Sequence, residues 1–323
     1  MSLTIIIPFL DEDSSLKKLL DSLIHSKENI FEIIIINTGT HDLKNLVDHK
    51  YFSFFKINIQ NRPNLFPGQA RNEGISLVKS EFVGFLDSKT IPKKNWVNES
   101  LSKLEQNYQF VFGKYTINES EWFPKILRAC TNGLKATDCL PGSVTSKKLL
   151  ERVNGFNKTT RAGEDIEFFT KLKMLDISTY SHSEPLISYS GLPRNLFLAL
   201  KKWYRYSFEN SKINILSNQK FLYGLIFLIS FLYFLYSWNY LFTGNQWNQS
   251  TFFIPHLNTT VWGLLLASYF SFRSIILPLK NKENITFIFP LNFIFIGIVG
   301  ILIDLIKMPG RLVGMLNFFT NRS

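Results

Sequence analysis

Residues 3–37 read LTIIIPFLDEDSSLKKLLDSLIHSKENIFEIIIIN. Isoleucine-rich runs at 3–9 and 33–36 flank a stretch in which leucines recur at the spacing of one helical face, so 14–25 is predicted to be an amphipathic helix. Both runs are apolar along their whole length, which indicates parallel strands covered on both faces. The segment therefore predicts a βαβ unit, the building block of an α/β fold.

The same pattern continues after this unit. Strands are expected at 57–59 and 82–87, and helices at 68–79 and 95–106. Strands that alternate with helices in this way form a single sheet with helices packed on its faces. We therefore assign residues 1–192 to one α/β domain.

The last third of the chain is far more apolar than the rest. No Asp, Glu, Lys or Arg occurs between Lys220 and Arg273, and an aromatic stretch of that length without charge has no solvated face. This composition excludes a purely soluble protein and predicts a membrane domain over residues 220–323. About three transmembrane segments are expected, near 221–243, 252–272 and 285–303.

Residues 193–219 connect the two parts and are predicted to form an amphipathic interfacial helix and a linker. An ordinary helix packed on its own domain is the alternative. Lys and Arg are frequent before the first expected span and absent from 243–258, so the positive-inside rule places the N-terminal domain in the cytoplasm. Three crossings would put Lys307 and Arg311 on the far side, against that rule. A re-entrant third segment and an interfacial tail are the alternatives.

The net charge of +11 fits either a nucleic acid or a membrane surface as partner. The basic residues cluster beside the apolar segments, and no zinc-finger or basic heptad spacing accompanies them. We therefore expect a membrane partner and no nucleic acid. Cys130 and Cys139 form no CxxC pair and the five histidines lack ligand spacing, so neither a disulfide framework nor a histidine metal cage is expected.

Four motifs carry polar residues in a defined order. They read IPFLDED from residue 7, INTGTHD from 36, PGQARNEGISLVKSEFVGFLDSKTIP from 67 and GSVTSKKLLERVNGFNKTTRAGEDIEFFTKLK from 142. In this order and spacing, residues 3 to 210 resemble the family 2 glycosyltransferases. The resemblance implies the GT-A fold, a Rossmann-like mixed sheet with helices on both faces. It also implies inverting transfer of a sugar, a hexose in the expected case, from a nucleotide-sugar donor.

Such a transfer has physical requirements that this sequence can meet. The nucleotide needs a cleft at the carboxyl ends of parallel strands, where ligands of open α/β sheets bind. The departing diphosphate needs positive charge, and a carboxylate must take the proton of the attacking hydroxyl. Carboxylates follow several expected strands, namely Asp11, Glu12, Asp42 and Asp87.

The resemblance also implies roles for particular residues. Asp165 matches the catalytic base and Glu164 stands beside it as an orienting or acceptor-contacting group; capping of the helix that begins there is the alternative. For Arg71 the alternative is an ordinary surface arginine. The residues that match the donor site are Pro8, Asp11, Glu12, Thr38, Arg71, Asn72, Asp87 and Lys89. The acceptor-side candidates, or else interfacial anchors, are Trp203 and Arg205.

The sequence departs from the family pattern at the metal motif and near the nucleotide. Asn37 and Thr38 stand where the family usually has paired acids. The D-x-D motif has become Asp87, Ser88 and Lys89. One carboxylate can still bind Mg²⁺ or Mn²⁺, so Asp87 is the expected metal ligand, but the ammonium of Lys89 is expected to weaken that site.

The sequence thus predicts a multi-pass enzyme of the inner (plasma) membrane with a cytoplasmic catalytic domain. It would transfer a sugar to a lipid or lipid-linked saccharide in cell-envelope assembly. A catalytically degenerate membrane scaffold or partner protein is the main alternative, supported by the losses at Asn37, Thr38 and Lys89. A transporter is disfavoured because the expected spans carry few ionisable residues.

Overall fold

The computed structural model describes residues 2–10, 13–40, 43, 47–212, 229–230 and 257–320. Three sequence-predicted site carboxylates, Asp11, Glu12 and Asp42, lie outside these residues, and so does nearly all of the expected span at 221–243.

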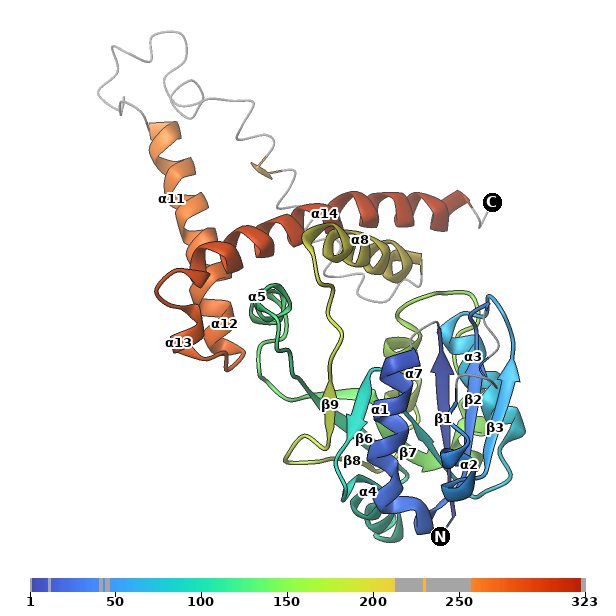
Figure 1. Cartoon of the computed structure of the whole chain (residues 1–323). Helices are drawn as coiled ribbons and strands as arrows, with labels where there is room; N and C mark the ends of the chain where they lie inside the picture. The colour runs from blue at the N-terminus through green and yellow to red at the C-terminus, as the bar shows by residue number, and fades with distance from the viewer. Residues whose placement is uncertain are drawn as a thin grey trace, which may run out of the picture.

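A mixed nine-stranded sheet forms the centre of the N-terminal domain (Figure 1). Its parallel part has the order β3-β2-β1-β4, and its other part continues through β7, β6, β9 and β5, with β8 pairing to β6. The parallel strands are β1 (Leu3–Phe9), β2 (Ile30–Asn37), β3 (Ile57–Asn61) and β4 (Phe82–Phe85). The others are β5 (Thr90–Pro92), β6 (Phe110–Ile117), β7 (Thr137–Ser146), β8 (Thr179–Ser181) and β9 (Ile187–Tyr189). This confirms the expected Rossmann-like mixed sheet.

Alternate isoleucines of the central strands fill two separate cores, one on each face of the sheet. Ile5 and Ile7 pack with helices α1 and α4, whereas Ile6 packs with α3, α6 and α7. Strands with this pattern are buried on both sides, as the uninterrupted apolar runs predict. The helices of this domain are α1 (Asp13–Leu23), the 3-10 helix Ile24–Asn29, α2 (Lys50–Phe54), α3 (Pro67–Leu77), α4 (Trp96–Glu105), α5 (Trp122–Cys130), α6 (Lys147–Arg152) and α7 (Glu164–Met174).

One glycine fixes how closely α3 approaches the sheet. A Cβ atom on Gly74 would lie 2.5 Å from Cγ2 of Ile6, so only glycine allows the helix this close to β1. The N-terminal turns of α3 consequently reach the carboxyl ends of the parallel strands.

The remaining described helices lie outside the sheet domain (Figure 1). They are α8 (Leu196–Lys212), α11 (Leu257–Ser271), a π-helical turn (Phe272–Ile276), α12 (Leu277–Lys280), α13 (Ile285–Ile288) and α14 (Asn292–Thr320). In Figure 1, α14 runs across α8 and α11 points away from the domain. A third buried cluster joins α5 of the domain to α8 and α14.

The expected three transmembrane segments are not supported. Among the described residues, one helix is long and apolar enough to cross a bilayer, Asn292–Asn317. The segment expected at 285–303 is interrupted, because α13 ends at Ile288 and α14 begins at Asn292. Pro290 lies in this break, where it cannot donate a helical hydrogen bond and disfavours helix at the residue before it.

Candidate active site

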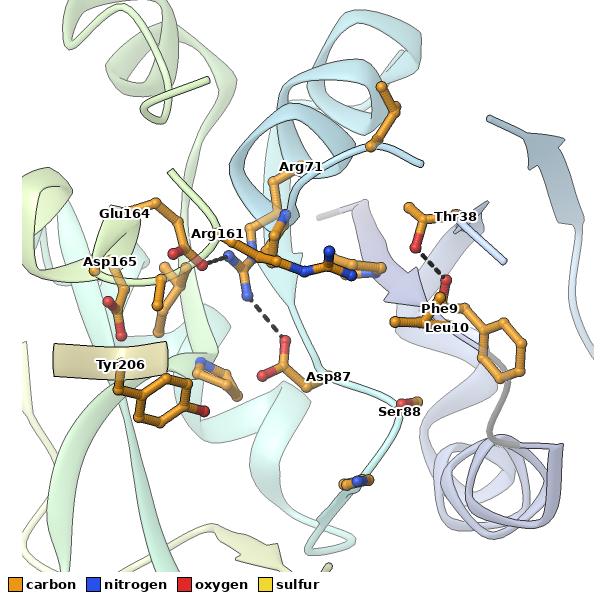
Figure 2. Close-up of a pocket in the computed structure, with 18 of the residues that line it drawn as sticks. Phe9, Leu10, Thr38, Arg71, Asp87, Ser88, Arg161, Glu164, Asp165 and Tyr206 are labelled. Atoms are coloured by element: carbon orange, nitrogen blue, oxygen red, sulfur yellow. Dashed lines mark hydrogen bonds and ion pairs between the residues drawn. The ribbon is translucent and has the colours of Figure 1, made fainter. Parts of the chain in front are cut away.

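A pocket of about 440 Å³ opens at the carboxyl ends of β1, β2 and β4 (Figure 2). Pro8 and Thr38 line it from the ends of the first two strands, and Asp87 and Lys89 from the segment after β4. The start of α7 contributes Glu164 and Asp165. The fold thus brings together residues far apart in sequence at the edge where open α/β sheets bind ligands.

Arg71 of α3 is the centre of this pocket's charged network. Its side chain is buried, and it donates from Nη1 to Oε1 of Glu164 at 2.6 Å and from Nη2 to Oδ1 of Asp87 at 3.0 Å. Burial alone would lower the pKa of Arg71, but the neighbouring carboxylates of Asp87 and Glu164 raise it overall. Arg71 is therefore a permanent buried cation and not a surface arginine.

Asp165 lies in the first turn of α7 and lines the pocket, and its surroundings change the pKa of its carboxyl. Burial, and then repulsion by Glu164, raises the pKa of its carboxyl, while Arg71 opposes that shift. A carboxylate with a raised pKa holds an accepted proton more firmly. Figure 2 shows Asp165 beside Tyr206 at the pocket wall.

Helix capping explains only part of the Glu164-Asp165 pair. The N-cap of α7 is Gly163, whose φ of 86° is left-handed and which makes no side-chain cap bond. Glu164 bonds Arg71, and Asp165 accepts one first-turn amide, from Ile166 at 2.8 Å. Capping by Asp165 therefore does not exclude a catalytic role for the same carboxyl.

The side chains that replace the family's paired acids are tied to the sheet. Asn37 donates to Oδ1 of Asn61 at 2.9 Å, which joins β2 to β3. The hydroxyl of Thr38 donates to the carbonyl of Phe9 at 2.9 Å, although Thr38 still lines the pocket. These two positions hold the strand ends in register.

Asn72 does not line the pocket. Its side-chain amide donates to the carbonyl of Phe156 and accepts from the amide of Phe156, both at 2.8 Å. It therefore fastens the segment before α7 to α3, and positions Glu164 and Asp165 relative to Arg71.

The described residues do not form a metal site by themselves. No group of three or more His, Cys, Asp and Glu side chains suited to a metal occurs in the described ranges. Asp87 is partly exposed to the pocket but is already ion-paired with Arg71, and Lys89 lines the same pocket. The Lys89 stem packs over Gly191, because a Cβ atom there would lie 2.6 Å from Lys89 Cδ.

Neither acceptor-side candidate lines the pocket. Trp203 packs against the cluster shared by α5 and α14, and Arg205 is exposed. Tyr206 and Asn210 of the same helix line the pocket instead. The helical periodicity of α8 indicates which of its residues share a face. Which of these faces meets the pocket depends on how α8 crosses the domain, and that is a matter of tertiary packing.

Sequence reasoning missed several pocket residues, among them the polar side chains of Arg161, Tyr206 and Asn210. Figure 2 shows Arg161 extended over the pocket between Arg71 and Thr38. Burial, together with the nearby acids Asp87 and Asp165, raises the pKa of Tyr206 to about 12, so its hydroxyl stays a hydrogen-bond donor. Among the residues that the structure describes, the buried Oδ1 of Asn210 finds no hydrogen-bond partner.

The fold defines a class of protein: a glycosyltransferase-like domain with a GT-A-type mixed sheet. The comparison with known families agrees. Residues 4–163 match the sequence model of glycosyl transferase family 2. The N-terminal domain therefore belongs to glycosyl transferase family 2.

Several bacterial proteins are similar to this chain. An uncharacterized glycosyltransferase of Rickettsia bellii is 28% identical over 181 residues, which are 50% of this chain and 25% of that protein. The uncharacterized glycosyltransferase EpsJ of Bacillus subtilis is 24% identical over 217 residues, 59% of this chain and 63% of EpsJ. A crystal structure of S. aureus TarS 1-349 with UDP-GlcNAc superposes with a TM-score of 0.49 at 15% identity, covering 65% of this chain and 66% of that one. The chain thus spans less than two thirds of these relatives.

Proposed function

We propose that the chain is an active, inverting glycosyltransferase that moves a sugar, a hexose in the simplest case, from a nucleotide-sugar donor to a lipid or lipid-linked acceptor. The observation that carries the proposal is the buried Arg71, which holds Asp87 and Glu164 around a pocket beside the raised-pKa Asp165. Family membership supports the reaction class.

In the proposed reaction the acceptor oxygen attacks the anomeric carbon, and its proton passes to Asp165. The bond between that carbon and the donor phosphate breaks, and its electron pair leaves with the nucleoside diphosphate. Lys89 and Arg161 line the pocket and would offset the charge of this leaving group. Arg71, already shared by two carboxylates, would keep Asp87 and Glu164 in place.

The degenerate-scaffold alternative is less consistent with this geometry. Buried ion pairs are weak sources of stability, because desolvation of the charges offsets their attraction. A scaffold has no need for a buried arginine between two acids beside a pocket. A transferase uses that arrangement to fix its reacting groups.

We also propose that the protein is attached to the membrane. Residues 263–269 of α11 are exposed on every side, and they include Leu264, Leu265 and Leu266. A helix whose exposed residues are apolar on every side is more stable in the hydrocarbon of a bilayer than in water.

The segment that follows α11 is bonded to the catalytic domain. Arg128 of α5 makes a two-pronged buried ion pair with Glu283, through bonds of 3.0 and 2.8 Å. Lys280 and Lys282 therefore lie on the same side as the catalytic domain, which the positive-inside rule makes the cytoplasmic side. A plasma-membrane location with a role in envelope assembly is part of the same proposal.

The proposal is tested with the purified full chain and a panel of nucleotide sugars. We expect one donor class to raise the thermal unfolding temperature progressively with the logarithm of its concentration and to be turned over slowly to nucleoside diphosphate. Binding of no donor and of no free nucleoside diphosphate would favour the scaffold.

Lys89 gives a prediction that concerns the metal. If its ammonium replaces the second metal-binding acid, donor binding should persist in a chelator, and Lys89→Ala should slow transfer by about tenfold or more, the value of one charge-assisted bond. The measurement is the initial rate of donor turnover with and without EDTA. Lys94→Ala, an exposed lysine outside the pocket, is the matched control. Strict Mg²⁺ or Mn²⁺ dependence with an unaffected Lys89→Ala would show that Asp87 binds a metal without help from Lys89.

A further inference from the structure

α14, the longest helix in the described part of the chain, contacts the catalytic domain along its first half. Ile296, Val299 and Ile303 of α14 are buried in one cluster with Ile126 and Leu127 of α5. Trp122, at the start of α5, also donates from its ring nitrogen to Asn292 at 3.1 Å. This half of α14 is therefore packed on the domain that carries the active site.

The second half of α14 packs just as closely on α8. A Cβ atom on Gly310 would lie 2.7 Å from the carbonyl oxygen of Tyr204, and Gly314 approaches Phe208 in the same way. The hydroxyl of Ser207 donates to the carbonyl of Lys307 at 2.7 Å. Small residues four apart let two helix backbones come this close.

α8 in turn lies directly over the pocket, because Tyr206 and Asn210 line it. Figure 1 shows α14 running across α8 and past α5, while α11 leads away from the domain. At 1.5 Å per residue the 29 residues of α14 span roughly 43 Å, about the full thickness of a bilayer with its headgroups. The first half of this helix therefore lies against α5 of the domain and the second half against α8, which covers the pocket. This arrangement favours an orientation along the membrane surface over one that crosses the bilayer.

The opposite face of α14 is apolar and exposed. Ile298, Leu305 and Leu312, spaced by two helical turns, are 47%, 53% and 62% exposed, and Leu316 one further turn along is 65% exposed. We call these four residues the outer stripe. Lys201 and Arg205 of α8, the helix on which α14 packs, are exposed, and their positive charge suits anionic lipid headgroups.

The one acid within α14 also fits a position near the membrane surface. Asp304 accepts from the hydroxyl of Tyr269 at 2.7 Å, pairs with Arg273 at 3.0 Å and pairs with Lys307 at 3.3 Å. Such a cluster is costly at the centre of a bilayer but not at headgroup level. Tyr269 lies at the domain-proximal end of α11 and Arg273 in the π-helical turn that follows it, where the chain leaves the membrane under the topology proposed above.

We propose that α14 lies flat in the membrane interface, with its outer stripe in lipid and its inner face on α5 and α8, and does not span the bilayer. The proposal rests on the membrane attachment proposed above. It removes the conflict with the positive-inside rule, since Lys307 and Arg311 then stay on the cytoplasmic side. It also places α8 and the pocket on the membrane-facing side of the domain, near the lipid surface that would deliver the acceptor.

The test measures the depth of single spin labels in vesicles of phosphatidylcholine and phosphatidylglycerol. The full chain, with Cys130 and Cys139 replaced by alanine, receives one label through Ile298→Cys, Leu305→Cys or Leu312→Cys. Oxygen and nickel-chelate relaxation report how deep each label lies. We expect all three at one shallow depth, about 5–10 Å into the headgroup and acyl boundary.

A spanning helix predicts a different result. Residues 298 and 312 would then differ in depth by up to roughly 21 Å, in sequence order, and this outcome would overturn the proposal. Leu265→Cys on α11 is the control for a deep label, and Lys94→Cys the control for an aqueous one. If the label at Leu265→Cys is deep but the labels on α14 lie at graded depths, only the flat orientation of α14 is wrong. If Leu265→Cys is aqueous as well, membrane attachment fails too. Labels shielded from both lipid and water, with spin coupling between copies, would mean that a second copy covers the stripe.

Discussion

Arg71→Ala is expected to destabilise the protein by about 3–5 kcal/mol, because it leaves the carboxylate of Glu164 buried without its partner. Glu164 and Arg71 are both buried and joined at 2.6 Å, so the substitution removes the charged partner of a buried carboxylate. The measurement is the free energy of unfolding of the full chain in one fixed detergent.

Two controls isolate the buried charge. Arg62 makes an ion pair of 2.9 Å with Glu73 at the surface, so Arg62→Ala should cost at most about 1 kcal/mol. The double variant Arg71→Met with Glu164→Gln should recover part of the loss, since no unpaired buried charge remains. An Arg71→Ala protein as stable as Arg62→Ala would contradict the geometry of the site.

Asp165→Asn is expected to lower the transfer rate by a factor of about 10² to 10⁴, the usual value of a positioned general base. Asparagine keeps the shape of the side chain but cannot accept the proton of the acceptor hydroxyl. Donor binding should remain, because the charged network around Arg71 is intact. Asp176→Asn is the matched control at the other end of α7, at an exposed position with a φ of 47° that suits asparagine.

The raised pKa of Asp165 gives the same variant a pH signature. Transfer by the wild type should fall as the pH drops through a value above that of an ordinary aspartate, because the protonated carboxyl cannot act as a base. A carboxyl whose pKa is raised by folding destabilises the folded state once it is ionised. Asp165→Asn should therefore unfold at the same temperature as the wild type or higher at neutral pH, with the difference vanishing in acid. A clear loss of stability would favour a purely structural role.

Much of the α/β core follows from sequence pattern. The uninterrupted isoleucines of β1 and β2 can only be buried on both faces, and the leucines of α1 mark the helix between them. The pocket position follows as well, since carboxylates after parallel strands share one edge of a sheet. The inference that Arg71 and Asp87 belong to one site came from their motifs, and the structure joins them at 3.0 Å.

Other features depend on long-range packing that no local pattern encodes. α14 is apolar on both its inner face, which meets α5 and α8, and its outer stripe, so its composition is that of a transmembrane helix. Asn72 lies next to Arg71 in sequence but turns to the backbone of Phe156. Tyr206 lies three residues after Trp203, and the crossing of α8 over the pocket makes it the residue that faces the acids.

The central claim is that this pocket transfers a sugar through Asp165. Its most direct test compares the wild type with Asp165→Asn in the same vesicles, with donor binding and nucleoside diphosphate release measured on each sample. The account predicts that both proteins bind the donor with similar affinity and that only the wild type turns it over at an appreciable rate. Equal turnover by both proteins, or donor binding by neither, would contradict it.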